Sequence, residues 1–249
     1  MKTILAALAA TVMLAAPATA LDLTDLDDAE RQALRTEIRA YLLENPEVIM
    51  EAVAVLEQRQ TAEQAQGDAQ MIATNAEALF RDEDSWEGGN PDGDLTLVEF
   101  MDYRCGYCRR AAPEVNELVE GDGDIRFIVK EFPILGEQSV LASRFAIAVR
   151  QLEGDAAYKQ AHDALIAFRG EIGRDTLARI AENLGLEAAP LLERMDSDAV
   201  SDVIARNHQL ANRLQITGTP TFIFDDRMLR GYVPLDKMQE VAAQIRQDG

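Results

Sequence analysis

The only two cysteines of the chain lie two residues apart, in the stretch Cys105-Gly106-Tyr107-Cys108. A thiolate attacks disulfides, and a second cysteine close by can resolve the mixed disulfide that forms. A zinc site usually needs four ligands, and no further ligands cluster near this pair. A structural disulfide across so short a loop would constrain the unfolded chain very little. The spacing therefore favours a redox pair in which Cys105 attacks and Cys108 resolves.

The residues around the pair favour an anionic sulfur at Cys105. This cysteine falls where a predicted strand ends and a predicted helix begins, and the free N–H groups of a helix N-terminus stabilise a thiolate. Arg104, Arg109 and Arg110 are expected to add positive charge. The alternative is that these arginines are ordinary surface groups, because salt screens exposed charges.

Glu99 is the second residue that can take part in this chemistry. Alternate residues of a strand share a face, so Glu99 points the same way as Leu97 and Met101 and is expected to be buried. Burial raises the pKa of a carboxyl group and lets it hold or pass a proton when Cys108 must become a thiolate. The alternative is that Glu99 reaches solvent near the end of the strand.

Composition excludes several classes of partner. The chain of 249 residues has 44 acidic and 24 basic residues, a net charge of −20, which disfavours binding to nucleic acid or anionic lipid. With 47% hydrophobic residues it can bury a core without a disulfide or a metal. His162 and His208 have no cysteine nearby and are interpreted as ordinary helix residues, so we expect no metal site and no organic cofactor.

The first twenty residues have the pattern of a signal peptide. Lys2 precedes an apolar run from Ile4 to Ala16, and small residues at positions 18 and 20 predict cleavage after Ala20. A retained membrane anchor is the alternative, but the run falls short of the roughly 20 residues that span a bilayer. We therefore expect an exported protein in a compartment where disulfides persist.

Residues 21–80 are predicted to form a helical arm. One helix begins near Asp25, and Asn45-Pro46 ends it and starts a second helix that runs to about Phe80. Apolar residues recur along the second helix at Ile49, Val53 and Leu56, and then at Ala62, Ala65, Ala69, Ile72, Ala76 and Leu79. They need a cover, which either a second chain or the preceding helix of the same chain can supply.

Residues 81–249 are predicted to be a separate α/β domain. Turn-forming residues at 82–94 mark the boundary. The predicted elements are a buried strand at 95–101, a helix at 109–119, a strand at 124–134, several helices within 137–214, a hairpin at 220–233 and a last helix at 234–247. This order predicts a βαβ unit with a helical insertion before the sheet resumes.

The stretch EFMDYRCGYC, with an acid six residues before the first cysteine, and TGTPTF from Thr217 resemble the DsbA-like branch of the thioredoxin superfamily. The resemblance implies a thioredoxin fold with a helical insertion and a cis bond before Pro220. It also implies that Thr219 offers backbone hydrogen bonds to an extended substrate, and that Gly106 and Tyr107 contact the substrate. Without the resemblance, Pro220 is a turn proline, and most bonds before proline are trans.

The stretch YLLENPEVIMEAVAVLEQ is similar to the leader region of the suppressor-of-copper-sensitivity (ScsC) group of exported DsbA-like proteins. This resemblance implies a periplasmic thiol:disulfide oxidoreductase that acts on unfolded or misfolded exported proteins and is recycled by a membrane redox partner. It also implies a homo-oligomer through residues 21–80, although the alanine-rich seam from Ala62 to Leu79 is a poor surface for association. The alternative function is soft-metal binding, such as Cu(I), by the same two thiolates.

Overall fold

The computed structural model describes residues 26–248, and these form two compact units, residues 26–59 and residues 60–248. The predicted signal peptide, with cleavage after Ala20, lies outside the described residues. None of the helices in the described part of the chain is both long enough and apolar enough to cross a membrane.

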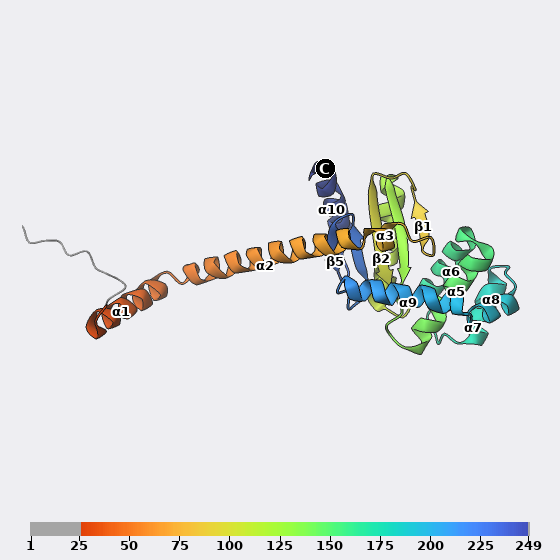
Figure 1. Cartoon of the computed structure of the whole chain (residues 1–249), viewed down its shortest axis with the longest axis horizontal. Coiled ribbons are helices and arrows are strands. Elements are labelled where there is room, and N and C mark those ends of the chain that lie inside the picture. Colours follow the sequence, from red (N-terminus) through yellow and green to blue (C-terminus); the bar gives the residue numbers. More distant parts are fainter. Residues whose placement is uncertain (1–25, 249) are drawn as a thin grey trace, which may run out of the picture. The chain divides into compact units, whose positions relative to one another are not determined.

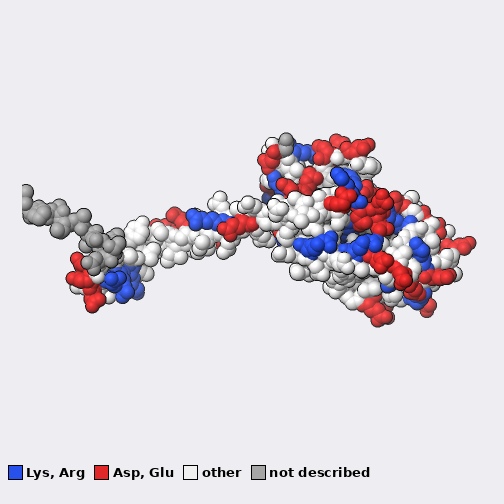
Figure 2. Space-filling model, in the orientation of Figure 1, with Lys and Arg blue, Asp and Glu red and all other residues white. Residues whose placement is uncertain are grey.

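The first unit consists of α1 (Asp28–Glu44) and the beginning of α2 (Glu47–Thr74), with the predicted break at Asn45. The Asp27 side chain caps α1 by accepting a hydrogen bond from the backbone N–H of Glu30. No residue of α1 is buried. The apolar residues Ile49, Met50, Val53, Val55 and Leu56 of α2 are also exposed. The helix α1 therefore does not cover the apolar face of α2, whose surface shows long uncharged stretches (Figure 2).

The end of α2 belongs to the second unit. Ile72 and Leu79 are buried in the same core cluster as Val98 of the sheet. Asp68 is buried and accepts two hydrogen bonds from Arg230, at 2.7 and 2.8 Å. The predicted second helix does not run unbroken to Phe80, because α2 ends at Thr74 and a short helix α3 (Ala76–Phe80) follows.

The second unit is built on a five-stranded sheet in the order β1-β3-β2-β4-β5 (Figure 1). The strands β2 (Leu95–Met101) and β3 (Ile125–Glu131) are parallel, and α4 (Gly106–Asp122) connects them, which confirms the predicted βαβ unit. The predicted hairpin is present as β4 (Thr221–Phe224) and β5 (Arg227–Arg230), and β4 pairs antiparallel with β2.

The edge strand β1 (Trp86–Gly89) was not predicted, because its residues lie within a stretch rich in turn formers. It pairs antiparallel with β3. Gly89 has a φ of +71°, and a Cβ there would lie 2.2 Å from the carbonyl oxygen of Ile125. Gly89, one of the glycines that suggested a loop, is therefore required by the close approach of β1 to β3.

Helices cover both faces of the sheet (Figure 1). The inserted helices are α5 (Glu137–Glu153), α6 (Asp155–Ala167), α7 (Arg174–Asn183), α8 (Ala188–Arg194) and α9 (Asp198–Arg213), and α10 (Leu235–Asp248) follows the hairpin. One core cluster contains both cysteines and residues of α4 to α10, and the other contains residues of α2, α3 and α9. With both faces covered, six of the seven residues of β2 are buried.

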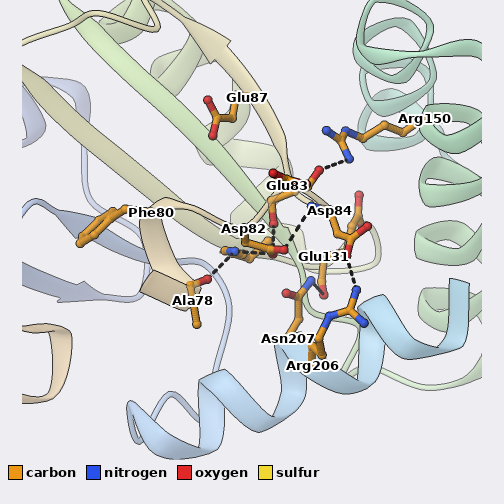
Figure 3. A network of polar contacts seen from close by, with 12 residues as sticks. Ala78, Phe80, Asp82, Glu83, Asp84, Glu87, Glu131, Arg150, Arg206 and Asn207 are labelled. Atoms are coloured by element: carbon orange, nitrogen blue, oxygen red, sulfur yellow. Dashed lines mark hydrogen bonds and ion pairs between the residues drawn. The ribbon is translucent and has the colours of Figure 1, made fainter. Parts of the chain in front are cut away.

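A buried ion pair ties the segment before the sheet to β3 (Figure 3). The Lys130 side chain is fully buried and donates hydrogen bonds to Asp82 Oδ2 at 2.7 Å and to the carbonyl oxygen of Ala78 at 2.9 Å. Burial lowers the pKa of Lys130, while the attraction to Asp82 opposes that change. The charge of Lys130 therefore depends on one carboxylate for compensation.

The substitution Asp82→Ala should lower the free energy of unfolding by about 3 to 5 kcal/mol, because it leaves the buried charge of Lys130 uncompensated. Urea denaturation measures this loss. Adding Lys130→Met to the same chain should recover part of the stability. The control Glu77→Ala should leave stability nearly unchanged, because its ion pair with Arg81 is exposed. A loss as small for Asp82→Ala as for this control would show that Asp82 does not compensate the buried charge of Lys130.

Candidate active site

The two cysteines meet at the first turn of α4. Cys105 is the N-cap residue of this helix, and its Sγ accepts a hydrogen bond from the backbone N–H of Cys108 at 3.5 Å. The Cys105 Sγ also lies 3.2 Å from the carbonyl oxygen of Thr219, to which the thiol donates. Both side chains are free thiols and are buried, with 6% of Cys105 and 1% of Cys108 exposed. The more accessible sulfur is therefore the one at the helix terminus.

The surroundings make the two thiols chemically unequal. The pKa of Cys105 is lowered to about 5, chiefly by the hydrogen bond from the Cys108 side chain and against the effect of burial. Burial raises the pKa of Cys108, and the hydrogen bond to Cys105 and the nearby charge of Glu99 raise it further. At neutral pH the arrangement gives one thiolate able to attack and one thiol that must lose a proton before it can react.

The side chains of the three arginines contact groups other than the two sulfurs. Arg104 donates to the carbonyl oxygen of Gly170 at 2.7 Å, and Arg109 donates to that of Tyr103 at 2.8 Å. The guanidinium of Arg110 lies 4.3 Å from the centre of the Tyr232 ring. The largest cause that lowers the pKa of Cys105 is a hydrogen bond at its sulfur rather than the arginine charges that the sequence suggested.

Glu99 is buried, with 4% of its surface exposed, so the alternative that it reaches solvent is excluded. In the register of β2 its side chain shares a face with Leu97 and Met101, which belong to the core cluster that contains the cysteines. Burial raises the pKa of Glu99 to about 8, and the charges of Cys105 and Glu131 add to this effect. The carboxyl group can therefore exchange a proton near neutral pH.

The remaining predicted residues surround Cys105. The bond between Thr219 and Pro220 is cis, as the resemblance implied. Thr219 is half-buried and Pro220 is buried. Gly106 and Tyr107 are exposed, and the ring of Tyr107 stacks on that of Tyr232. The structure thus places the backbone of residues 219 and 220 on one side of Cys105 and an exposed aromatic ring on the helical side.

Sequence reasoning missed the buried polar groups that surround the loop before Cys105. Asp102 accepts hydrogen bonds from the backbone N–H groups of Arg104, Ile134 and Leu135, at 2.7, 2.8 and 3.0 Å. An aspartate directly after a strand is a signal for such a turn. Glu131 has no comparable signal, because its partners come from distant parts of the chain.

The two histidines are not placed to hold a metal. His162 lies on α6, buried against Tyr103, and the ring of His208 packs against Phe132. Among residues 26–248, no group of three or more His, Cys, Asp or Glu side chains is arranged to hold a metal ion.

Comparison with known proteins identifies both parts of the chain. Residues 96–243 match the family described as DSBA-like thioredoxin domain. Residues 30–63 match the domain described as the copper resistance protein ScsC N-terminal domain.

Solved structures agree with these matches. A thioredoxin-like oxidoreductase from Silicibacter pomeroyi is 38% identical, with a TM-score of 0.65, over 69% of this chain and 97% of the other. ScsC from Proteus mirabilis, in a transitional conformation, is 28% identical with a TM-score of 0.65 and covers 88% of this chain and 98% of that one. The helical insertion and the helical N-terminal region therefore occur together in a solved relative.

A curated relative is much longer than the region it shares. The Na(+)/H(+) antiporter NhaA 3 of Salinispora tropica is 29% identical over 143 residues, which are 57% of this chain and 22% of the antiporter. The chain thus spans about a fifth of the length of this relative.

Alkylation of Cys105 should follow a thiolate with a midpoint near pH 5, because its pKa is lowered to about 5. The rate is measured with iodoacetamide on the reduced protein from pH 3 to 9, the range that brackets this midpoint. Cys108→Ala should move the midpoint upward by about 1 pH unit or more, because the hydrogen bond from Cys108 is lost. The matched variant Cys108→Ser keeps a donor and should move it less. Equal midpoints in all three proteins would show that Cys108 does not stabilise the thiolate.

Proposed function

The chain belongs to the DSBA-like thioredoxin domain family, and from this membership and the site geometry we propose that it is a thiol:disulfide oxidoreductase. The observation that carries the proposal is the opposite shift in the pKa values of the two cysteines. Cys105 has a lowered pKa at a helix N-terminus, while Cys108 is buried with a raised pKa beside the carboxyl group of Glu99. This combination suits attack by one sulfur and delayed resolution by the other.

The exchange takes two steps. The Cys105 thiolate attacks a client disulfide, an S–S bond forms between Cys105 and the client, and one client sulfur leaves as a thiolate. Cys108 then gives its proton to the Glu99 carboxylate and attacks Cys105 Sγ, so the mixed disulfide breaks and the second client thiolate leaves. The client disulfide is reduced and the Cys105–Cys108 pair is oxidised by two electrons. The same steps in reverse form a disulfide in the client.

The clients in this proposal are unfolded or misfolded exported proteins. An extended client segment can receive backbone hydrogen bonds from Thr219, next to Pro220, while Gly106 and the exposed Tyr107 contact it from the helical side. The N-terminal twenty residues and the ScsC-type region support export to the periplasm. A membrane redox partner would restore the state of the cysteine pair.

Soft-metal binding by the two thiolates is a second candidate, favoured by the match of residues 30–63 to a domain described from a copper resistance protein. The described part of the chain offers two cysteine thiolates for it. Disulfide exchange measured in the presence of a copper chelator separates the two functions. Activity that persists with the chelator and is lost in Cys105→Ser supports the oxidoreductase, and unaffected turnover in that variant contradicts it.

The substitution Glu99→Gln should slow release of the mixed disulfide on the order of 10²-fold at neutral pH, because a neutral amide cannot accept the proton of Cys108. In the unsubstituted protein the release rate should rise with pH as Glu99 loses its proton. The midpoint should lie below 8, because the Cys105 charge that helps raise the Glu99 pKa to about 8 is absent from the mixed disulfide. Rapid-quench measurement of the intermediate gives both results, and an unchanged rate profile removes Glu99 from the mechanism.

Within the predicted arm of residues 21–80, the part from residue 60 on belongs to the second unit, so we further propose that residues 21–59 mediate a homodimer or homotrimer. The exposed apolar residues of α1 and α2 in this unit support association with a second copy, because large apolar patches on a soluble protein usually mark a contact surface. Several Cys105 sites in one assembly would raise the effective concentration of thiolate around a bound client. This arrangement favours isomerisation of wrong disulfides over a single exchange.

Light scattering of the protein lacking residues 1–20 should give the mass of a dimer or trimer at micromolar concentration. Val53→Lys should dissociate it, because the lysine places a charge in the apolar face of α2. The matched variant Gln58→Lys adds the same charge on the polar side of the helix and should stay associated. Deletion of residues 21–59, which spares buried Ile72 and Leu79, should give a folded monomer that exchanges disulfides but isomerises poorly. A monomeric starting protein contradicts this proposal.

A further inference from the structure

A buried polar network lies beside the active site, and the mechanism above does not use it. Its centre is Glu131, the last residue of β3, with 3% of its surface exposed. Glu131 Oε1 accepts hydrogen bonds from the hydroxyls of Tyr103 at 2.7 Å and Tyr158 at 2.6 Å, and Oε2 accepts one from Ser143 at 2.7 Å. These three hydroxyl donors fill most of the acceptor sites of the buried carboxyl group and favour its ionised form.

The network joins the helical insertion to the loop that carries Cys105. Ser143 comes from α5 and Tyr158 from α6. The side-chain amide of Asn207 on α9 donates a hydrogen bond to the backbone carbonyl of Glu131 at 3.0 Å (Figure 3). Tyr103 lies two residues before Cys105 and is fully buried. Since the carbonyl oxygen of Tyr103 also accepts from Arg109 of α4, the residue is fixed at both its side chain and its backbone.

Glu131 and Glu99 lie on the same face of the sheet. In the parallel register of β2 and β3, Glu99 is opposite Val129 and Met101 is opposite Glu131. Residues that are opposite in the register, and residues two apart on one strand, share a face. The two carboxyl groups are therefore diagonal neighbours in the layer that contains the cysteines, and each acts on the charge of the other.

The direction of the hydrogen bonds around Tyr103 depends on whether Glu131 is ionised. Tyr103 has one hydroxyl proton and two partners, because His162 Nδ1 lies 3.1 Å from its oxygen. When Tyr103 donates to Glu131, His162 must donate from Nδ1, whereas a protonated Glu131 allows Tyr103 to donate to His162. Burial raises the pKa of Glu131 to about 7, and the three hydroxyl donors oppose that rise. Glu131 is therefore ionised over the range in which Glu99, with a pKa of about 8, loses its proton.

We propose that Glu131 is a positioning residue for disulfide exchange: it fixes Tyr103 in the loop before Cys105, and its carboxylate charge, diagonal to Glu99 in the same buried layer, opposes ionisation of Glu99. The inference rests on the role of Glu99 in the proposed function. The titratable groups that face Glu131 are Asp102 and Tyr103 in the loop, Glu99 on β2, and Tyr158 and His162 on α6. The helices α5 and α9 supply only the neutral partners Ser143 and Asn207.

The test is the pH profile of mixed-disulfide release in the full chain. Glu131→Gln should lower the midpoint of the profile by about 1 pH unit, because the charge that opposes ionisation of Glu99 is gone. Glu131→Asp keeps a carboxylate, so its midpoint should lie closer to that of the unsubstituted protein than the midpoint of Glu131→Gln does. The control Glu87→Gln removes an equal charge that is paired with Arg126 on β3 and should leave the midpoint unchanged.

A double substitution separates this inference from the proposed function. In the Glu99→Gln background, Glu131→Gln should cause no further shift, because no carboxyl group remains at position 99 to titrate. If Glu99→Gln removes the pH-dependent step but Glu131→Gln leaves the midpoint unchanged, the inference is overturned and the role of Glu99 stands. If Glu99→Gln has no effect, the role of Glu99 is wrong and the inference falls with it.

A measurement on the unsubstituted protein covers the case in which Glu131→Gln does not fold. Carboxyl ¹³C NMR of the reduced protein should show the Glu131 and Glu99 carbons titrating near neutral pH, each with a second inflection that reports the other. A Glu131 carbon that keeps the chemical shift of a protonated carboxyl group from pH 5 to 9, the range around its pKa of about 7, overturns the inference.

Discussion

The parallel register between β2 and β3 determines where every ionisable group of the site lies. Leu95 to Met101 pair in order with Ile125 to Glu131, so the carboxyl ends of both strands meet at one edge of the sheet. The loop with Tyr103 and Cys105 leaves β2 at this edge, and Glu131 ends β3 beside it. A slip of one residue would turn Glu99 to the opposite face, away from the cysteines.

Burial on that face then shifts the pKa values of the ionisable groups of the site. The same desolvation that raises the pKa of Cys108 also raises those of Glu99 and Glu131. At Cys105 the hydrogen bond from the Cys108 side chain, together with backbone hydrogen bonds at the helix N-terminus, outweighs the effect of burial. One layer of the fold therefore holds a thiolate, a thiol and two carboxyl groups that exchange protons near neutral pH.

The sequence predicted the parts of the site that lie close together along the chain. The strand at 95–101, the βαβ unit, the cysteine pair and the burial of Glu99 followed from local pattern, and the cis bond before Pro220 followed from resemblance. The strand β1 was missed because its glycines resemble a turn, although contact with β3 requires Gly89. The Glu131 network was missed because its hydrogen bonds join residues 12 to 28 positions apart. No local periodicity reports such a contact.

The helical insertion therefore does more than cover the sheet. Through Ser143 and Tyr158 it holds the carboxyl group of Glu131, and the hydroxyl of Tyr103 joins that group to the residues directly before Cys105. The dipeptide Gly106-Tyr107 is exposed and makes none of these buried contacts. A relative with the same cysteine pair and Glu99, but with apolar residues at the insertion positions, would bury Glu131 with Tyr103 as the remaining hydroxyl donor. Burial would then favour the neutral form of Glu131, and Glu99 would lose its proton at lower pH. The proton chemistry of the pair is thus a property of the sheet and the insertion together.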